Sequence, residues 1–241
     1  MAITKVSQSL IADNAIGLAQ LAGGTDGNLI TYDASGNPAA VSTGSANQVL
    51  VSAGAGAPPT FQAVPTVRSG EIIEQIAMVC DGTTQTVASG TYTSQNVTGV
   101  LNLTTSYQDV TGSLLAYTPP SGTTRVVYTF AFQGSFADVS SATGISHWRL
   151  YLDSDEVTRA RRTIGGATLE IGGFIQWVFQ IGGTAATETG RVSSWGSAKT
   201  IKLQARENAA GNQFKVHSNF YWDGSSDPQD VKPVITVAAI R

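Results

Sequence analysis

Residues 124–136 read TRVVYTFAFQGSF, and this stretch decides the fold. Every second side chain from Val126 to Phe132 is a large apolar or aromatic group, whereas the other face carries Val127, Thr129, Ala131 and Gln133. A period of two is typical of a β-strand that buries one face and leaves the other in polar surroundings. The stretch therefore predicts a long strand in a sheet that is packed on one side.

The same alternation recurs through residues 70–241. In residues 147–153, HWRLYLD, the apolar side chains of Trp148 and Leu150 point one way and Arg149 points the other. About ten such segments, separated by turn residues, predict an antiparallel β-sandwich. The expected strands are Ile72–Val79, Gly99–Thr104, Gln108–Tyr117, Thr124–Phe136, His147–Asp153, Glu156–Ile164, Gly173–Ile181, Thr200–Glu207, Gln213–Trp222 and Pro233–Ile240.

Charged residues make up only 13% of the 241 residues, and the net charge is −3. This charge leaves no overall basic footprint for nucleic acid. The single cysteine, Cys80, excludes an internal disulfide and a thiolate metal cluster, so we expect a small buried hydrophobic side chain there. The first ten residues, MAITKVSQSL, lack the pattern of a secretory signal, and no apolar run approaches the roughly 20 residues of a membrane span. We therefore expect a protein made in the cytosol that does not insert into membranes.

The composition changes near residue 66. Residues 1–66 contain one cation and three anions, and Tyr32 and Phe61 are their only aromatic residues. A segment of this length with two aromatic residues cannot build a compact core within one chain. We therefore divide the chain into an N-terminal attachment or shaft segment, 1–66, and a C-terminal β-sandwich, 67–241. The N-terminal segment is then either disordered or folded against other chains.

Three features favour folding against other chains. Residues 9–22, SLIADNAIGLAQLA, contain breaks that suit short helices or turns better than one long helix. A β-hairpin is expected from a strand at Leu29–Tyr32, a turn, and a return through Ala39–Val41. A second apolar strand, Gln48–Ser52, precedes a Gly/Pro turn and Phe61.

Isolated hairpins are marginal in water. Three copies wound together would bury their apolar side chains between chains, and the small residues around them would let the backbones approach closely. The side chains expected in this trimeric core are Leu29, Ile30, Val49, Leu50 and Phe61. The segment is therefore expected to form an extended homotrimeric shaft.

Two stretches resemble parts of known proteins. The pattern from Gly27 to Asp33, then Gly44 to Leu50 and Gly56 to Phe61, resembles a cassette in the virion fibres of tailed bacteriophages. From Ser69, SGEIIEQIAMV and later TTSYQDVTGSLLAYTPPSGTTRVVYTFAF are similar to the start of tip domains that follow such shafts. The resemblance implies a trimeric tip domain with a jelly-roll fold of tumour-necrosis-factor-like shape.

No catalytic or metal-binding pattern stands out. The sequence has no Gly-x-Ser-x-Gly elbow, no phosphate-binding Gly-x-x-x-x-Gly-Lys-Ser/Thr loop, and no His-x-x-x-His or Cys-x-x-Cys spacing. His147 and His217 are expected in the middle of strands, on the faces opposite the aromatic residues, where they would meet solvent or an interface. We therefore expect a protein that is not an enzyme and needs no cofactor or metal.

Two features are candidates for binding. Arg159, Arg161 and Arg162 form the densest basic group, with Arg159 and Arg161 expected on one face of a strand. They could bind an acidic glycan or a phosphate, or pair with acids of a neighbouring subunit. Trp195 lies in the polar stretch RVSSWGSAK, where we expect an exposed ring that stacks on a sugar or packs across a trimer interface.

These expectations converge on a structural component of a bacteriophage particle, located in the virion. It would be a homotrimeric fibre that docks to tail, baseplate or capsid proteins through its N-terminal segment. Its tip would serve host-surface attachment, with a host surface glycan as one partner. Two alternatives stay open: a head fibre or capsid decoration protein, and a cellular glycan-binding module of the same fold.

Overall fold

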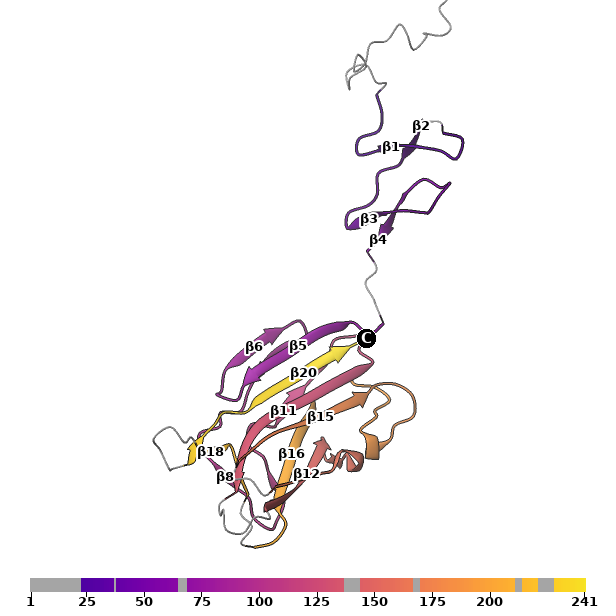
Figure 1. Cartoon of the computed structure of the whole chain (residues 1–241). Coiled ribbons are helices and arrows are strands. Elements are labelled where there is room, and N and C mark those ends of the chain that lie inside the picture. The colour runs from indigo at the N-terminus through magenta and orange to yellow at the C-terminus, as the bar shows by residue number, and fades with distance from the viewer. Residues whose placement is uncertain are drawn as a thin grey trace, which may run out of the picture. The chain divides into compact units, whose positions relative to one another are not determined.

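The computed structural model describes residues 23–36, 38–64, 69–136, 144–166, 170–210, 214–220 and 228–241 (Figure 1). Contacts within the chain divide it into two compact units, Met1–Thr66 and Val67–Arg241. This boundary coincides with the change of composition near residue 66. The short helices or turns expected in residues 9–22 lie outside the described residues.

The described part of the first unit consists of two antiparallel hairpins, β1–β2 and β3–β4. Their strands are Leu29–Tyr32 (β1), Pro38–Val41 (β2), Gln48–Val51 (β3) and Thr60–Ala63 (β4). In the first turn the Asp33 carboxylate accepts a hydrogen bond from the Ser35 backbone N–H at 2.8 Å, and Gly36 adopts the left-handed φ of 79° that glycine tolerates best. The strands predicted for this segment are confirmed, and β4 is an addition to them.

The second unit contains two six-stranded sheets whose paired strands are antiparallel. In the first sheet the strand order is β5-β20-β11-β17-β8, and β15 also pairs with β11. Figure 1 shows β5, β20, β11 and β15 side by side. The strands of this sheet are Ile72–Val79 (β5), Leu101–Asn102 (β8), Arg125–Phe136 (β11), Glu170–Gln180 (β15), Phe214–Val216 (β17) and Val234–Ile240 (β20).

The second sheet has the order β10-β16-β12-β13, with β14 beside β12 and β9 beside β16. Its strands are Gln108–Asp109 (β9), Leu115–Tyr117 (β10), Gly144–Leu152 (β12), Asp155–Glu156 (β13), Arg162–Gly166 (β14) and Lys199–Glu207 (β16). The chain turns tightly between β12 and β13, with Asp153 at a positive φ of 56°.

The alternation in the sequence predicts the core correctly. Tyr128 and Phe130 of β11 are fully buried, and Trp148 and Leu150 of β12 are buried as well. The Phe132 ring of the first sheet stacks on the Trp148 ring of the second, with a centroid distance of 4.6 Å. The two sheets therefore share one hydrophobic core and form the predicted antiparallel β-sandwich, an arrangement that agrees with a jelly roll.

Several expected strands are interrupted. The segment expected as Gln108–Tyr117 forms two short strands, β9 and β10, because the chain turns at Gly112, whose φ is 87°. The segment expected as Glu156–Ile164 is broken by a 3-10 helix at Thr158–Ala160 (η3). Here the prediction is wrong: Val157 and Ala160 are both buried, and a spacing of three suits a helical turn better than a strand.

Among the described residues, the structure adds one hairpin, one strand and one further 3-10 helix to the predicted elements. The hairpin is β6 (Thr84–Val87) with β7 (Gly90–Thr93), the strand is β19 (Pro228–Asp230), which pairs with β18 (Ser218–Phe220), and the helix is η4 (Thr187–Thr189). The strand expected at Gln213–Trp222 is split into β17 and β18 at His217, which has a positive φ of 62°. Both ends of that expected strand lie outside the described residues.

The start of β5 and the end of β20 lie together at one corner of the first sheet, where Figure 1 marks the C-terminus. The Gly70 backbone N–H donates to the Arg241 carbonyl, and the Arg241 N–H donates to the Glu71 carbonyl at 3.0 Å. The sandwich therefore begins and ends at the same corner of one sheet.

Candidate functional site

The predicted shaft residues are largely exposed on the two hairpins. The exposed fraction is 42% for Leu29, 71% for Ile30, 41% for Val49 and 45% for Leu50, whereas Phe61 is half-buried. In the described part of the first unit, Val41 is the only buried hydrophobic residue. The described part of the hairpins therefore presents exposed apolar side chains.

Polar contacts hold the hairpins in shape. The Thr43 hydroxyl donates to the Asp26 carbonyl at 2.7 Å, and the Thr43 backbone N–H donates to the Asn28 side-chain carbonyl at 2.9 Å. Gly44 lies against the Phe61 ring so closely that a Cβ there would be 2.6 Å from the ring's Cγ. The hydrogen bonds of Thr43 fix the backbone of the first hairpin. A residue larger than glycine at position 44 would displace the Phe61 ring.

The three candidate arginines do not share a strand face. Arg159 belongs to η3, Arg161 follows that 3-10 helix, and Arg162 begins β14, so the expectation of a common strand face for Arg159 and Arg161 is wrong. All three are exposed. Arg161 Nε donates to Glu156 Oε1 of the same chain at 2.6 Å.

Trp195 is buried, with 5% of its surface exposed, so the expectation of an exposed ring is wrong. Its indole Nε1–H donates to the Tyr117 carbonyl at 2.9 Å, and its ring meets Phe179 edge-on at a centroid distance of 5.8 Å. The serines on either side, Ser194 and Ser197, are exposed. The loop therefore turns its hydroxyl groups outward and inserts the tryptophan into the end of the sandwich.

His217 is also buried, contrary to the expected solvent-facing or interface position. The bend at its positive φ turns the imidazole inward, where Nε2 lies 2.9 Å from the Thr111 carbonyl. Burial lowers the pKa of His217 to about 4, against the opposing effect of that hydrogen bond. His147 is half-buried and lies within 3.0 Å of the Asn208 side-chain oxygen.

A cluster that the sequence analysis missed lies on the outer face of the second sheet. We define the cationic face as Tyr107, Arg149, Tyr151, Lys202 and Arg206. The guanidinium carbon of Arg149 lies 3.7 Å from the centre of the Tyr107 ring, and that of Arg206 lies 5.4 Å from it. Lys202 Nζ lies 5.8 Å from the centre of the Tyr151 ring. Such cation–π contacts fix the cations against rigid aromatic rings.

Two carboxylates border the cationic face. Glu156 Oε1 accepts a hydrogen bond from Arg161 Nε at 2.6 Å and lies 3.5 Å from Arg149 Nε. The hydrogen bond from Arg161 holds the pKa of Glu156 below its usual range. Partial burial would raise the pKa of Asp109, but hydrogen bonds from Gln204 and Lys202 outweigh it and lower the value. Three cations, Arg149, Arg161 and Lys202, pair with these two acids, and Arg206 adds a further positive charge beside the Tyr107 ring.

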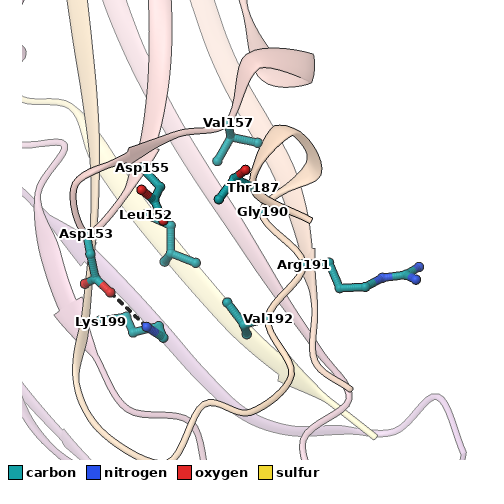
Figure 2. A pocket seen from close by; sticks show the side chains of 9 residues that line it. All are labelled: Leu152, Asp153, Asp155, Val157, Thr187, Gly190, Arg191, Val192 and Lys199. Atoms are coloured by element: carbon teal, nitrogen blue, oxygen red, sulfur yellow. Dashed lines mark hydrogen bonds and ion pairs between the residues drawn. The ribbon is translucent and has the colours of Figure 1, made fainter. Parts of the chain in front are cut away.

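A hollow beside η4 combines apolar walls with charged residues at its rim (Figure 2). Leu152, Val157 and Val192 line it, and Figure 2 shows Lys199 joined to Asp153 while Arg191 points away. The distance from Lys199 Nζ to Asp153 Oδ2 is 2.8 Å. Partial burial would raise the pKa of Asp153, but the hydrogen bonds from Lys199 and from the Thr200 N–H outweigh it. At this rim Lys199 and Asp153 therefore neutralise each other.

The buried carboxylate of Glu74 in β5 is also hydrogen-bonded by its neighbours. Glu74 accepts hydrogen bonds from the Ser89 N–H at 2.8 Å, the Ser89 hydroxyl at 2.5 Å and the Tyr117 hydroxyl at 2.8 Å. Burial and the contact with Glu74 raise the pKa of Tyr117. These bonds tie β5, β10 and the segment between β6 and β7 together, which is a structural role.

Cys80 is a buried free thiol, as predicted, and its Sγ donates to the Gly112 carbonyl at 3.2 Å. Burial raises the pKa of this thiol to about 11. Among the described residues, no group of three or more His, Cys, Asp or Glu side chains is placed to hold a metal ion. The described ranges also hold no helix that is long and apolar enough to cross a membrane.

Comparisons with known proteins show little similarity. No protein-family model matches the chain, and no curated protein matches it. Among solved structures, a chain from "Structure of infectious bursal disease virus Gx strain" is similar at 12% sequence identity with a TM-score of 0.31. The match covers 76% of this chain and 38% of that chain, so the present chain spans well under half of the viral one.

Proposed function

We propose that the protein is a non-enzymatic structural component of a bacteriophage particle, built as a homotrimeric fibre. The observation that carries this proposal is the exposure of Leu29, Ile30, Val49 and Leu50 on two well-formed hairpins. Two-stranded hairpins are marginal alone, and exposed apolar side chains are stabilised when other chains cover them. The resemblance of residues 27–61 to phage fibre shafts supports three copies and a virion as the setting.

In this proposal the N-terminal segment docks to tail, baseplate or capsid proteins, and the β-sandwich is the tip that contacts the host surface. The cationic face is the candidate contact surface, because Arg149, Lys202 and Arg206 present positive charge on a rigid sheet. A host surface glycan that carries carboxylate or phosphate groups is the partner whose charge complements this face.

The trimer is tested by light scattering on the purified full chain at micromolar concentration. The expected mass is three times the 25.0 kDa of one chain. Leu50→Asp should convert the trimer to monomers by placing a charge in the shaft, whereas Ala55→Asp, in the exposed turn of the same hairpin, should not. A monomeric wild-type chain would overturn the proposal.

Attachment is tested separately with the full chain and with chains that lack one part. Binding to intact bacteria that is lost on deletion of residues 70–241 supports the tip as the contact with the host. Binding to empty capsids that is lost on deletion of residues 1–30 would instead indicate a head fibre or decoration protein. Glycan binding without any association with particles would favour a cellular module.

A further inference from the structure

The outer face of the first sheet has a composition unlike that of the second. Strand register aligns the outward residues of β5, β20, β11 and β15 in rows across the sheet. We define the uncharged face as three of these rows: Val79, Val234, Ala131 and Phe174; Ala77, Thr236, Thr129 and Gln176; Gln75, Ala238, Val127 and Val178. None of these residues is charged, whereas the outer face of the second sheet carries the cationic cluster.

Large apolar side chains protrude from the uncharged face. Phe174 is 70% exposed, Val79 44%, Val178 43% and Val234 39%. A sheet face that meets water usually carries polar side chains at these alternate positions. Contiguous exposed apolar surface instead marks a place where another molecule binds. An exposed phenylalanine in such a patch is the kind of residue that anchors a protein interface.

The connection to the shaft indicates which molecule covers this face. The chain enters the sandwich at Gly70, whose N–H is bonded to the Arg241 carbonyl, and β5 and β20 then run together from this corner. In a homotrimeric shaft, the short stretch of sequence between Val64 and Gly70 tethers the three sandwiches to one another. Tethering of this kind raises the effective concentration of the tips for one another to roughly the millimolar range.

We propose that the uncharged face is the surface through which the three β-sandwiches contact one another around the fibre axis, an inference that rests on the proposed homotrimer. Around a threefold axis the three copies of one face converge, so a face without charges brings no like charges together there, whereas three copies of the cationic face would repel one another. Contact of this face with the neighbouring copy closes into a ring under threefold symmetry. The cationic face is then left on the outside of the tip.

The test compares two single cysteines in the full chain. Gln176→Cys lies in the uncharged face, and Thr163→Cys lies on β14 of the second sheet; both positions are exposed strand residues. Cys80 is buried with a pKa of about 11, so it stays unreactive toward a maleimide in the folded protein. In the purified protein only other copies of the chain are present to cover either position.

In trimeric protein, the maleimide should modify Gln176→Cys at least about tenfold more slowly than Thr163→Cys, because a covered thiol reacts only after local opening. The two rates should become equal in denaturant. Adding Phe174→Glu should restore fast labelling of Gln176→Cys while the mass stays trimeric, because the shaft still holds the chains. Circular dichroism would verify that the sandwich remains folded in each variant.

The outcomes separate this inference from the proposed fibre. Equal labelling of the two positions in a trimer would overturn the tip interface and leave the shaft trimer standing. Protection that survives Phe174→Glu would likewise overturn it, because the contact would then lie elsewhere. A monomeric wild-type chain would overturn both proposals.

Discussion

The two hairpins of residues 23–64 and the sandwich of residues 69–241 use the same kind of strand in opposite situations. Ile30 lies in β1 and is 71% exposed, whereas Ile235 lies in β20 and is 1% exposed. Ile235 pairs with Phe130 of β11 and Met78 of β5 in a sheet that has a second sheet behind it. Ile30 pairs with Ala40 in a two-stranded hairpin. Alternation alone therefore does not bury a side chain; a second layer of structure is required.

The difference has consequences for stability. Full burial of an isoleucine side chain contributes roughly 1.5–3 kcal/mol, which the sandwich obtains within one chain. In the proposed fibre the hairpins obtain it from contacts with other chains. We therefore expect sandwich unfolding to be independent of protein concentration, apart from any contribution of the tip interface, and shaft unfolding to depend on it strongly.

The largest effect is expected inside the sandwich. Trp148→Ala removes a ring that is 1% exposed and contacts Phe132 and Phe214, so it should destabilise the domain by about 4 kcal/mol. Denaturant unfolding followed by circular dichroism would measure this. His147→Ala, at the neighbouring half-buried position, is the control and should cost far less. A small decrease in the free energy of unfolding of Trp148→Ala would contradict the burial of this ring in a core formed within one chain.

The second effect depends on pH. The pKa of His217 is about 4 in the folded protein, against 6.5 as its ordinary value, because burial disfavours the imidazolium. Between these pH values the unfolded chain binds the proton and the folded chain does not, so the free energy of unfolding falls as pH falls from 6.5 to 4. The decrease should reach about 3 kcal/mol and then level off for this group.

His217→Asn should remove this component, because asparagine tolerates the positive φ and does not titrate. Urea unfolding of both proteins at pH 7 and pH 4.5 would measure the difference. Equal pH dependence in the two proteins would contradict the assigned burial of the imidazole. The hairpins should contribute nothing to this difference, since neither contains a histidine.

A smaller effect is expected in the shaft. Ile30→Ser should weaken assembly by about 2 kcal/mol per chain, since it removes an apolar side chain from the interface of the proposed trimer. The melting temperature of the sandwich should stay unchanged, apart from any loss of contacts between tips. Dilution series followed by light scattering would measure the assembly. Ala34→Ser, in the exposed turn of the same hairpin, is the control. If Ile30→Ser assembled as tightly as the wild-type chain, the assignment of Ile30 to the trimeric core would be contradicted.

The smallest effect is expected at the rim of the cationic face. Arg161→Ala removes an ion pair with Glu156 that is open to solvent on the arginine side, and such pairs contribute little after solvent screening. The melting temperature should be unchanged within error in a thermal scan. Arg149→Ala should lower it more, because this guanidinium also packs against the Tyr107 ring at 3.7 Å. The reverse order would contradict the structural role assigned to the stack.

Local patterns were sufficient to predict the alternating strands, because burial of one face leaves a period of two in the residues themselves. They were insufficient for Trp195, because its neighbours in the sequence are exposed serines and suggest an exposed loop. The ring is buried instead against Phe179 of β15. They also misplaced Arg159 and Arg161, because the burial of Ala160 imposes a helical turn there. The cationic face was missed because Tyr107, Arg149 and Arg206 come from three separate segments.

The sequence by itself determined the class of fold and the division near residue 66. It also determined that the N-terminal segment has too few aromatic residues to build a compact core within one chain. These properties depend on composition and on short-range periodicity. Only the tertiary structure decided which side chains meet: it turned His217 inward, buried Trp195, gathered the cationic face on one sheet and aligned three rows without charged residues on the other sheet. The physical reason is that strand order and register connect residues far apart in the chain, and no local pattern encodes those pairings.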